Sequence, residues 1–197
     1  TEVGTITPMP QYGNPKPRIF RLEKDKAIIN RNGFNNLGML EAKKKFEHYR
    51  KKFPVGSDFL VGINIGPNKD SDDRFSDYKV LAKNLSKFAD YISINVSSPN
   101  TPNLREFQNK ENLEKVINFV KDGIATSKTF NKKLPIFLKI APDINKQTLN
   151  SIIETAHSQK IYGLIISNTT LDRETNLKSK KSNESGGLSG KPLFKKS

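Results

Sequence analysis

The chain has 197 residues, no cysteine and a formal net charge of +14, from 34 Lys and Arg against 20 Asp and Glu. The absence of cysteine excludes a disulfide scaffold, a thiolate zinc site, an iron–sulfur cluster and a cysteine nucleophile. No apolar run approaches the roughly 20 residues that a membrane span needs, so the chain by itself is expected to be soluble or cytoplasmic. Its basic residues are mostly lysines spread over expected helix surfaces, and no nucleic-acid-binding motif occurs. No nucleic-acid partner is therefore expected.

The first thirty residues predict little regular structure. Residues 1–20 are rich in proline and glycine and have no helical period, which predicts an irregular segment with turns. The short apolar runs 18–22 and 27–30 lie on either side of a charged turn. They predict a small β-hairpin.

From residue 39 onward, helical and strand patterns alternate four times. Apolar residues at helical spacing predict helices within 39–53, 78–88, 113–124 and 149–156. Largely apolar runs predict strands over 59–65, 91–95, 134–140 and 162–167. Asp143 is predicted to cap the fourth helix, and residues 186–190 are predicted to form a closing loop. This order is typical of an α/β fold with parallel strands, either a βα barrel or a doubly wound sheet.

Polar side chains stand at the carboxyl end of each predicted strand. They are Asn64, Asn95, Lys139 and the run Ser167-Asn168-Thr169. The carboxyl ends of parallel strands converge on one rim, where α/β enzymes place their active sites. A lysine at the mouth of a buried strand is costly unless an anion or a conjugated ring meets it, and asparagine amides suit planar heterocycles. The rim therefore predicts a site for a flat polar ligand, or for two stacked ones.

Two common kinds of site are not indicated. No G-x-G-x-x-G motif occurs, and residues 185–192 depart from the P-loop pattern. His48 and His157 lie on predicted helices and share no metal-ligand spacing, so no metal site is predicted.

Several ordered motifs resemble one known family. Residues 95–102, Asn-Val-Ser-Ser-Pro-Asn-Thr-Pro, resemble the signature of the dihydroorotate dehydrogenases. The other matching segments are 2–18, 30–36, 138–143, 168–170 and 186–193. The first of them is typical of class 2, the quinone-dependent and membrane-associated branch. Class 1 enzymes carry cysteine as the catalytic base, whereas this position is Ser98 here, which again indicates class 2.

The resemblance implies a (βα)8 TIM-type barrel that carries FMN and oxidises dihydroorotate to orotate in pyrimidine biosynthesis. Dihydroorotate would lose a proton from C5 to a base and a hydride from C6 to the flavin, which would then pass electrons to a quinone. By position Ser98 would be the base, with Thr101 and Phe34 flanking its proton relay.

The resemblance also implies a set of binding residues. Those for the substrate are Asn30, Arg31, Asn32, Gly33, Phe34, Asn95, Asn100, Asn168 and Thr169. Those for FMN are Thr5, Asn64, Asn95, Lys139, Ser167 and Gly190. Lys139 would stabilise negative charge on the reduced flavin ring. The sequence departs from the family pattern at Asn103, where glycine is usual, and at Ser167, where threonine is common.

The family's barrel is longer than this sequence. Residues 1–197 are therefore expected to be the central part of one FMN-binding βα-barrel domain, without its first strands, its N-terminal membrane helices and its last strands. A partial barrel leaves strand edges unpaired, so these residues alone are expected to be poorly stable and inactive. The full-length enzyme would be peripheral, on the cytoplasmic side of the membrane.

Three alternative interpretations remain. The chain could be an inactive fragment of such an enzyme, a basic nucleic-acid-binding remnant, or a related flavin-dependent pyrimidine or uridine reductase. The charge and the short length favour the second alternative. The serine at position 98 and the segment 4–18 argue against the third.

Overall fold

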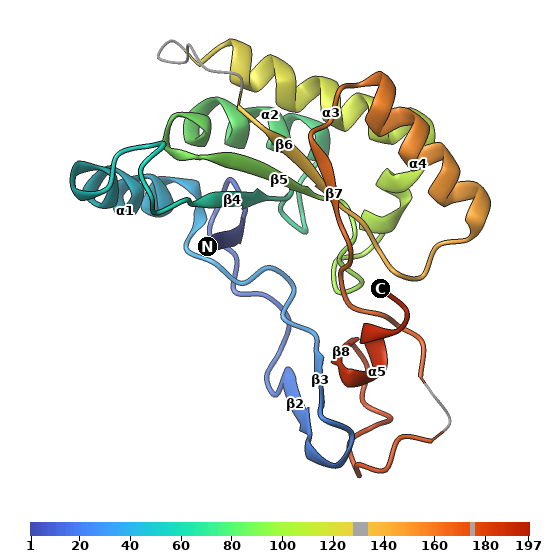
Figure 1. Cartoon of the computed structure of the whole chain (residues 1–197). Coiled ribbons are helices and arrows are strands. Elements are labelled where there is room, and N and C mark those ends of the chain that lie inside the picture. The colour runs from blue at the N-terminus through green and yellow to red at the C-terminus, as the bar shows by residue number, and fades with distance from the viewer. Residues whose placement is uncertain (128–133, 174–175) are drawn as a thin grey trace.

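A five-stranded parallel sheet forms the centre of the computed structural model, which describes residues 1–127, 134–173 and 176–197 (Figure 1). Its strand order is β1-β4-β5-β6-β7. These strands are β1 (Glu2–Ile6), β4 (Gly62–Ile65), β5 (Tyr91–Asn95), β6 (Ile136–Lys139) and β7 (Gly163–Ile165). A smaller antiparallel sheet contains β2 (Ile19–Leu22), β3 (Ala27–Asn30) and β8 (Gly187–Gly190). The α/β class with a parallel sheet is thus confirmed.

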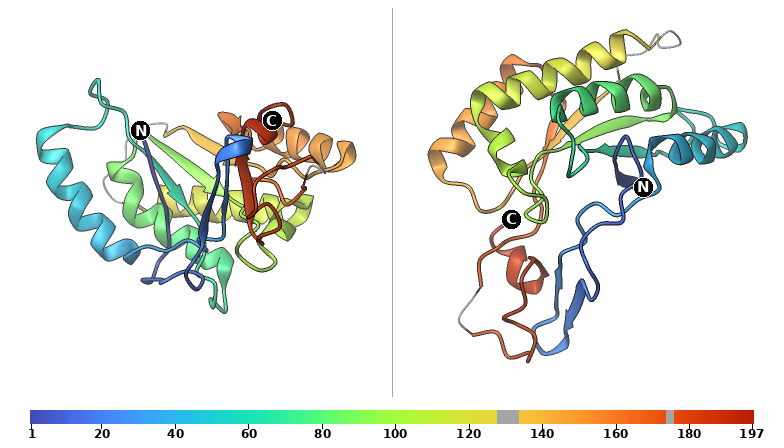
Figure 2. Two further views of the ribbon diagram at one scale, coloured as in Figure 1. Left: turned by 90° about the horizontal axis from the view of Figure 1, so that it is seen from below. Right: turned by 180° about the vertical axis from the view of Figure 1, so that it is seen from behind.

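Helices cover one face of the parallel sheet (Figures 1 and 2). They are α1 (Gly38–Lys52), α2 (Arg74–Leu85), α3 (Lys110–Ala125) and α4 (Lys146–Ser158), followed near the end of the chain by the short α5 (Lys191–Phe194). Short 3₁₀ helices occupy Glu23–Asp25, Ser86–Phe88 and Leu104–Gln108. The smaller sheet lies below the parallel sheet and away from α1–α4, with α5 beside β8 (Figure 1).

The parallel strands divide their side chains between two environments. Successive residues of a strand point to opposite faces, and register aligns Ile63 with Ile92, and Ile94 with Leu138. All four side chains are fully buried on the face that the helices cover. The alternate positions near the carboxyl ends of β4, β5 and β6 carry Asn64, Asn95 and Lys139, so the opposite face is polar there. The same alternation therefore builds the core and supplies the polar rim.

Most predicted elements are confirmed, including the hairpin and the four helices. Two predictions about loops are wrong, because residues 2–6 form β1 and residues 187–190 form β8. Both strands exist through pairing with distant segments, β1 with β4 and β8 with β3, which local propensity does not reveal. The predicted strand over 59–65 begins only at Gly62.

The predicted cap of the fourth helix is also wrong. Asn145 is the N-cap of α4, because its side chain accepts a 2.8 Å hydrogen bond from the backbone N–H of Thr148. Asp143 lies two residues earlier and binds groups of other loops instead, as described below.

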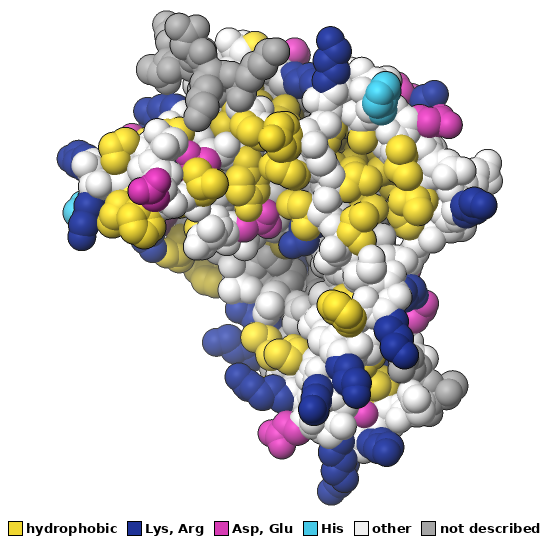
Figure 3. Space-filling model, in the orientation of Figure 1, with side chains coloured by type: hydrophobic (Ala, Val, Ile, Leu, Met, Phe, Trp, Pro, Cys, Tyr) yellow, Lys and Arg dark blue, Asp and Glu magenta, His cyan; other side chains and the backbone are white. Residues whose placement is uncertain are grey.

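The surface is rich in cations. Lys and Arg side chains are numerous around the smaller sheet in Figure 3, with hydrophobic side chains between them. No helix in the described part of the chain is long and apolar enough to span a bilayer.

A buried ion pair ties α1 to the start of β5. Arg50 donates from Nη2 to Asp90 Oδ2 at 2.7 Å, and the two side chains are only 8% and 5% exposed. Asp90 also accepts from the backbone N–H groups of Gly56 and Val61, both at 2.7 Å. Burial alone would raise the pKa of the Asp90 carboxyl, but these hydrogen bonds and Arg50 outweigh it and lower the pKa. The pair thus joins a helix, a loop and a strand end.

We expect Arg50→Met to lower the free energy of unfolding by about 3–5 kcal/mol, because it leaves the Asp90 carboxylate buried without its cation. Urea denaturation measures the change. The matched control is Lys51→Met, on the exposed side of the same helix, which should change the free energy by no more than about 0.5 kcal/mol. Equal denaturation midpoints for the two variants would contradict the assignment.

Candidate active site

A cavity of about 300 Å³ lies at the carboxyl ends of the parallel strands. Amide and hydroxyl groups dominate its lining, which consists of Gly4, Thr5, Asn30, Asn32, Gly33, Phe34, Asn35, Asn95, Ser98, Asn100, Lys139, Asn168 and Thr169. All of these except Gly4 and Asn35 were predicted to be site residues. The segment that follows β3 supplies one wall, and the ends of β1, β5, β6 and β7 supply the rest. Two sheets therefore build the cavity jointly.

A hydrogen-bonded chain of polar side chains lies across the strand ends on one side of the cavity. Asn95 donates from Nδ2 to Thr5 Oγ1 at 2.9 Å, and Thr5 donates to Asn64 Oδ1 at 2.7 Å. Asn64 donates in turn from Nδ2 to Glu2 Oε1 at 2.8 Å, and this carboxylate oxygen lies 3.9 Å from Lys139 Nζ. The lysine therefore has a counter-charge, while its side chain still faces the cavity.

Glu2 is a functional candidate that sequence reasoning missed. Glu2 contacts Asn64 and Lys139, and it also accepts a 3.3 Å hydrogen bond from the Tyr91 hydroxyl. Burial raises the pKa of this tyrosine hydroxyl. The sequence could have indicated Glu2 only if residues 2–6 had been recognised as a strand, because Glu2 then lies on the same face of the sheet as Gly62 and Asn64.

The loop after β5 holds two nearly buried hydroxyls. Ser98 is 5% exposed, and its Oγ accepts a 3.2 Å hydrogen bond from the Asn100 backbone N–H. Thr101 is 3% exposed, and its hydroxyl has no hydrogen-bond partner among the described residues. A buried hydroxyl without a partner is unfavourable unless another group, such as a water or a ligand, meets it. The Thr101 hydroxyl in this loop is therefore free to bind a water or a ligand.

Asparagine amides hold the remaining walls together. Asn168 donates from Nδ2 to Ser97 Oγ at 3.0 Å, which joins the loops after β7 and β5. Asn100 donates from Nδ2 to the Asn30 carbonyl at 3.0 Å, which joins the loop after β5 to the end of β3. The Asn100 amide oxygen accepts no hydrogen bond from the described residues, so this wall can bind a polar ring that enters the cavity.

Five predicted site residues do not line the cavity. They are Arg31, Asn64, Thr101, Ser167 and Gly190. Arg31 forms an ion pair with Glu184 at 2.9 Å. Gly190 pairs with Ala27 in the smaller sheet at a φ of +97°, and a Cβ there would lie 2.5 Å from the Lys26 carbonyl oxygen.

The other three lie close behind the lining. Asn64 contacts Thr5, and Thr101 follows Ser98 in the same loop. Ser167 donates to the Asn168 carbonyl at 2.9 Å and lies 2.7 Å from Ser197 Oγ. No group of three or more His, Cys, Asp or Glu that could hold a metal occurs in residues 1–127, 134–173 or 176–197.

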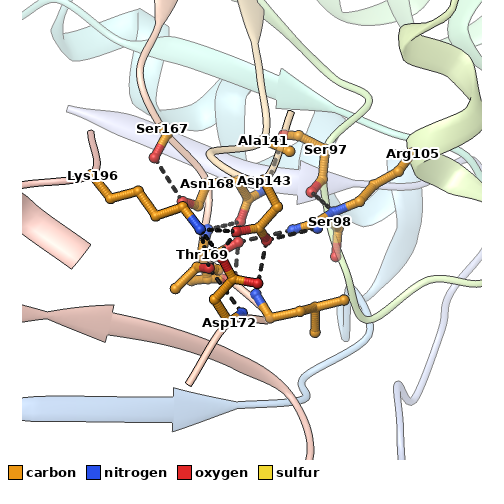
Figure 4. Close-up of polar contacts among 12 residues, drawn as sticks. Ser97, Ser98, Arg105, Ala141, Asp143, Ser167, Asn168, Thr169, Asp172 and Lys196 are labelled. Atoms are coloured by element: carbon orange, nitrogen blue, oxygen red, sulfur yellow. Dashed lines mark hydrogen bonds and ion pairs between the residues drawn. The ribbon is translucent and has the colours of Figure 1, made fainter. Parts of the chain in front are cut away.

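Asp143 is the centre of a charged cluster beside the cavity (Figure 4). It binds Arg105 and Lys196, each at 2.9 Å, and also accepts from the Thr170 hydroxyl and from the Leu171 backbone N–H. Burial alone would raise the pKa of the Asp143 carboxyl. The hydrogen bonds from Lys196, Thr170, Leu171 and Arg105 outweigh that effect and hold the pKa well below its ordinary value of 3.8.

Comparison with known proteins gives one consistent result. A family model described as "Dihydroorotate dehydrogenase" matches residues 1–197. A Brucella ovis protein named dihydroorotate dehydrogenase (quinone) is 47% identical over 197 residues, which are 100% of this chain and 53% of that protein. A Rhodopseudomonas palustris protein of the same name is 45% identical over 195 residues, 98% of this chain and 52% of its own length. The chain thus spans about half the length of the curated relatives it matches.

Solved structures agree with the sequence comparison. The chain resembles a ligand-free DHODH from Eimeria tenella with a TM-score of 0.92 at 40% identity, over 100% of this chain and 58% of the other. A second structure, DHODH in complex with ferulenol from Eimeria tenella, gives a TM-score of 0.90 at 39% identity, over 97% of this chain and 55% of the other.

We expect the free energy of unfolding to depend less on pH in acid for Asp143→Asn than for the parent chain. A carboxyl with a lowered pKa stabilises the folded state fully above its ordinary pKa, and that stability is lost as the pH falls below 3.8 toward the lowered value. Urea midpoints measured from about pH 6 to about pH 3 should therefore fall more steeply for the parent chain than for the variant. Parallel curves would show that Asp143 does not contribute in this way.

Proposed function

The chain belongs to the dihydroorotate dehydrogenase family, and from this premise we propose that its strand-end cavity takes part in the oxidation of dihydroorotate to orotate, a step of pyrimidine biosynthesis. Its five parallel strands are part of a TIM-type βα barrel like that of the structures it resembles. The observation that carries the proposal is the cavity itself, where Ser98, Lys139 and several asparagines converge.

The lining suits the substrate's polar ring. Dihydroorotate carries a carboxylate, two ring carbonyls and two ring N–H groups. An asparagine amide both donates and accepts hydrogen bonds, so Asn30, Asn95, Asn100 and Asn168 can meet its edges. Arg31, Asn32, Gly33, Phe34 and Thr169 complete the proposed substrate set.

Ser98 is proposed as the base that takes the C5 proton. A serine hydroxyl is a weak base, so it must pass its own proton on as it accepts another, and it works best away from bulk water. Ser98 is nearly buried, and the Thr101 hydroxyl three residues on lacks a partner among the described residues. We assign Thr101 to the proton relay, with Phe34 forming part of the wall that excludes water.

The donor set also fits FMN. Thr5, Asn95 and Lys139 present hydroxyl, amide and ammonium groups to the cavity, and Asn64 holds Thr5 from behind. The ammonium group of Lys139 suits a ring that gains negative charge, and its ion pair with the Glu2 carboxylate is long, at 3.9 Å. These residues would hold FMN, whose chemistry would be to take up the hydride from C6 and to transfer electrons to a quinone. Ser167 and Gly190, outside the cavity, would contact other parts of the same cofactor.

The domain assignment follows from the same premise. We propose that residues 1–197 form the central part of one FMN-binding barrel domain, since the whole chain matches about half the length of each curated relative. The other half of such a protein would supply the remaining strands.

Peripheral contact with the cytoplasmic side of an anionic membrane is part of the proposal. Residues 16–31 and 176–197, which contain the smaller sheet, hold twelve Lys and Arg against three Asp and Glu. The exposed face of this sheet pairs Arg21 with Ile28, and Ile28 and Ile19 are both solvent-exposed. Cations with apolar side chains between them are typical of surfaces that contact anionic lipid headgroups.

The central test is the visible spectrum, with FMN and under anaerobic conditions, of a protein that carries residues 1–197 together with the remaining strands of the barrel. We expect bound flavin that dihydroorotate bleaches, and we expect Ser98→Ala to slow the bleaching about 10²–10⁴-fold, since proton transfer by a positioned group contributes that much. Ser86→Ala is the matched control, because Ser86 is equally buried but lies in a 3₁₀ helix outside the cavity. Absent flavin binding, or bleaching unchanged by Ser98→Ala, would contradict the proposed site.

Membrane contact has its own test. The chain should co-sediment with vesicles that contain phosphatidylserine more than with neutral phosphatidylcholine vesicles, and added salt should weaken the binding. Each basic residue near the surface contributes about 1 kcal/mol, so Lys24→Glu with Lys26→Glu should reduce binding by tenfold or more. Lys43→Glu with Lys44→Glu on α1 is the control of equal charge. Equal losses for the two pairs would exclude a specific lipid-facing surface.

A further inference from the structure

One arginine outside the cavity connects three of the loops that surround it. Arg105, in the 3₁₀ helix Leu104–Gln108, donates from Nε to the Ser97 carbonyl at 3.2 Å and from Nη2 to the Thr169 carbonyl at 2.9 Å. Its Nη1 donates to Asp143 Oδ2 at 2.9 Å. The acceptors come from the loops after β5, β7 and β6, and Figure 4 shows them meeting at one guanidinium group.

The sheet alone does not fix the distance between the two outer loops. β5 and β7 each pair with β6 and not with each other, and their pairing ends at Asn95 and Ile165. The residues that matter to the proposed reaction, Ser98 and Thr169, lie beyond those ends. Arg105 contacts the carbonyl of the residue before Ser98 and the carbonyl of Thr169 itself. It therefore spans the gap that the strand pairing leaves open.

Asp143 holds the arginine in this orientation. The two side chains are 24% and 13% exposed, so solvent screens the pair only in part. Asp143 is itself fixed by the Leu171 backbone N–H at 2.8 Å and by Lys196. Gln108, at the end of the same 3₁₀ helix, accepts from the Ala141 backbone N–H at 2.9 Å. The helix is thus tied to the end of β6 at both of its ends.

We propose that Arg105 is a positioning residue, held by Asp143, that sets the separation between the base-bearing loop 96–101 and the loop 168–170. Its effect on turnover rests on the function proposed above. A planar guanidinium can donate in three directions at once, whereas a lysine ammonium cannot reproduce that fork. Loss of the fork leaves the bond from Asn168 to Ser97 Oγ to join the two loops, so their separation is held less tightly. A misplacement of about 1 Å in such a site costs about 10²-fold in rate.

The first test needs neither substrate nor cofactor. Hydrogen–deuterium exchange should become faster in both loops, 96–101 and 168–170, in Arg105→Lys, and stay unchanged in α2 and α3. Arg74→Lys is the matched control, because Arg74 also donates to two backbone carbonyls, those of Pro102 and Lys69, but joins no cavity loop to β7. Faster exchange confined to 104–108, or no change, would overturn the proposal.

The second test separates positioning from a purely structural role. At saturating dihydroorotate, Arg105→Lys should reduce the rate of flavin bleaching about 10²-fold, with a smaller rise in the dissociation constant for dihydroorotate. Asp143→Asn should also lower the bleaching rate and raise the dissociation constant, as Arg105→Lys does. If Arg105→Lys does not fold, Asp143→Asn is used as the test variant. An affected dissociation constant with an unchanged rate would overturn the proposal. A parent protein with the complete barrel that never bleaches its flavin would contradict the proposed function, while the exchange result would still decide the role of Arg105.

Discussion

The two-residue alternation of the parallel strands is the constraint on which the rest of the structure depends. Because neighbouring side chains of a strand point to opposite faces, a segment such as Gly62–Ile65 serves two environments at once. Ile63 and Ile65 enter the helix-covered core, and Asn64 between them belongs to the polar face. A shift of register by one residue would exchange the two faces and would destroy both the core and the site. Packing and chemistry are thus specified by the same few residues.

The polar face is costly, and the structure offsets most of that cost internally. Asn95, Thr5, Asn64 and Glu2 pass hydrogen bonds from one to the next, so few groups there are unpaired. The hydroxyl of Thr101 is an exception among the described residues. A site that satisfies its own polar groups keeps its shape without a ligand, which lowers the cost of ordering it when a ligand binds. The walls are therefore preorganised.

Local periodicity predicted the helices and the central strands, and the polar residues that end the strands predicted Asn95, Lys139, Asn168 and Thr169 of the cavity lining. The other lining residues that were predicted came from the family resemblance. Local periodicity did not predict β1 or β8, since neither has a strong local pattern and both depend on distant partners. Glu2 was missed with β1. Asp143 was predicted to cap α4, as its position before a helix suggests, but Arg105 and Lys196 lie far away in sequence and bind it instead. Long-range pairing decided each of these cases.

The small sheet also has a consequence for the order in which the molecule assembles. Its strands β3 and β8 bring Ile28 and Ser189 together, although these residues are 161 positions apart. Contacts at such separation carry a large loop-closure cost and form slowly. Asn30 ends β3 and pairs with Gly187, so one wall of the cavity is fixed only when β8 has been synthesised. Residues 187–190 must therefore leave the ribosome before this wall of the pocket can close, and the parallel strands β1 to β7 have time to pair first.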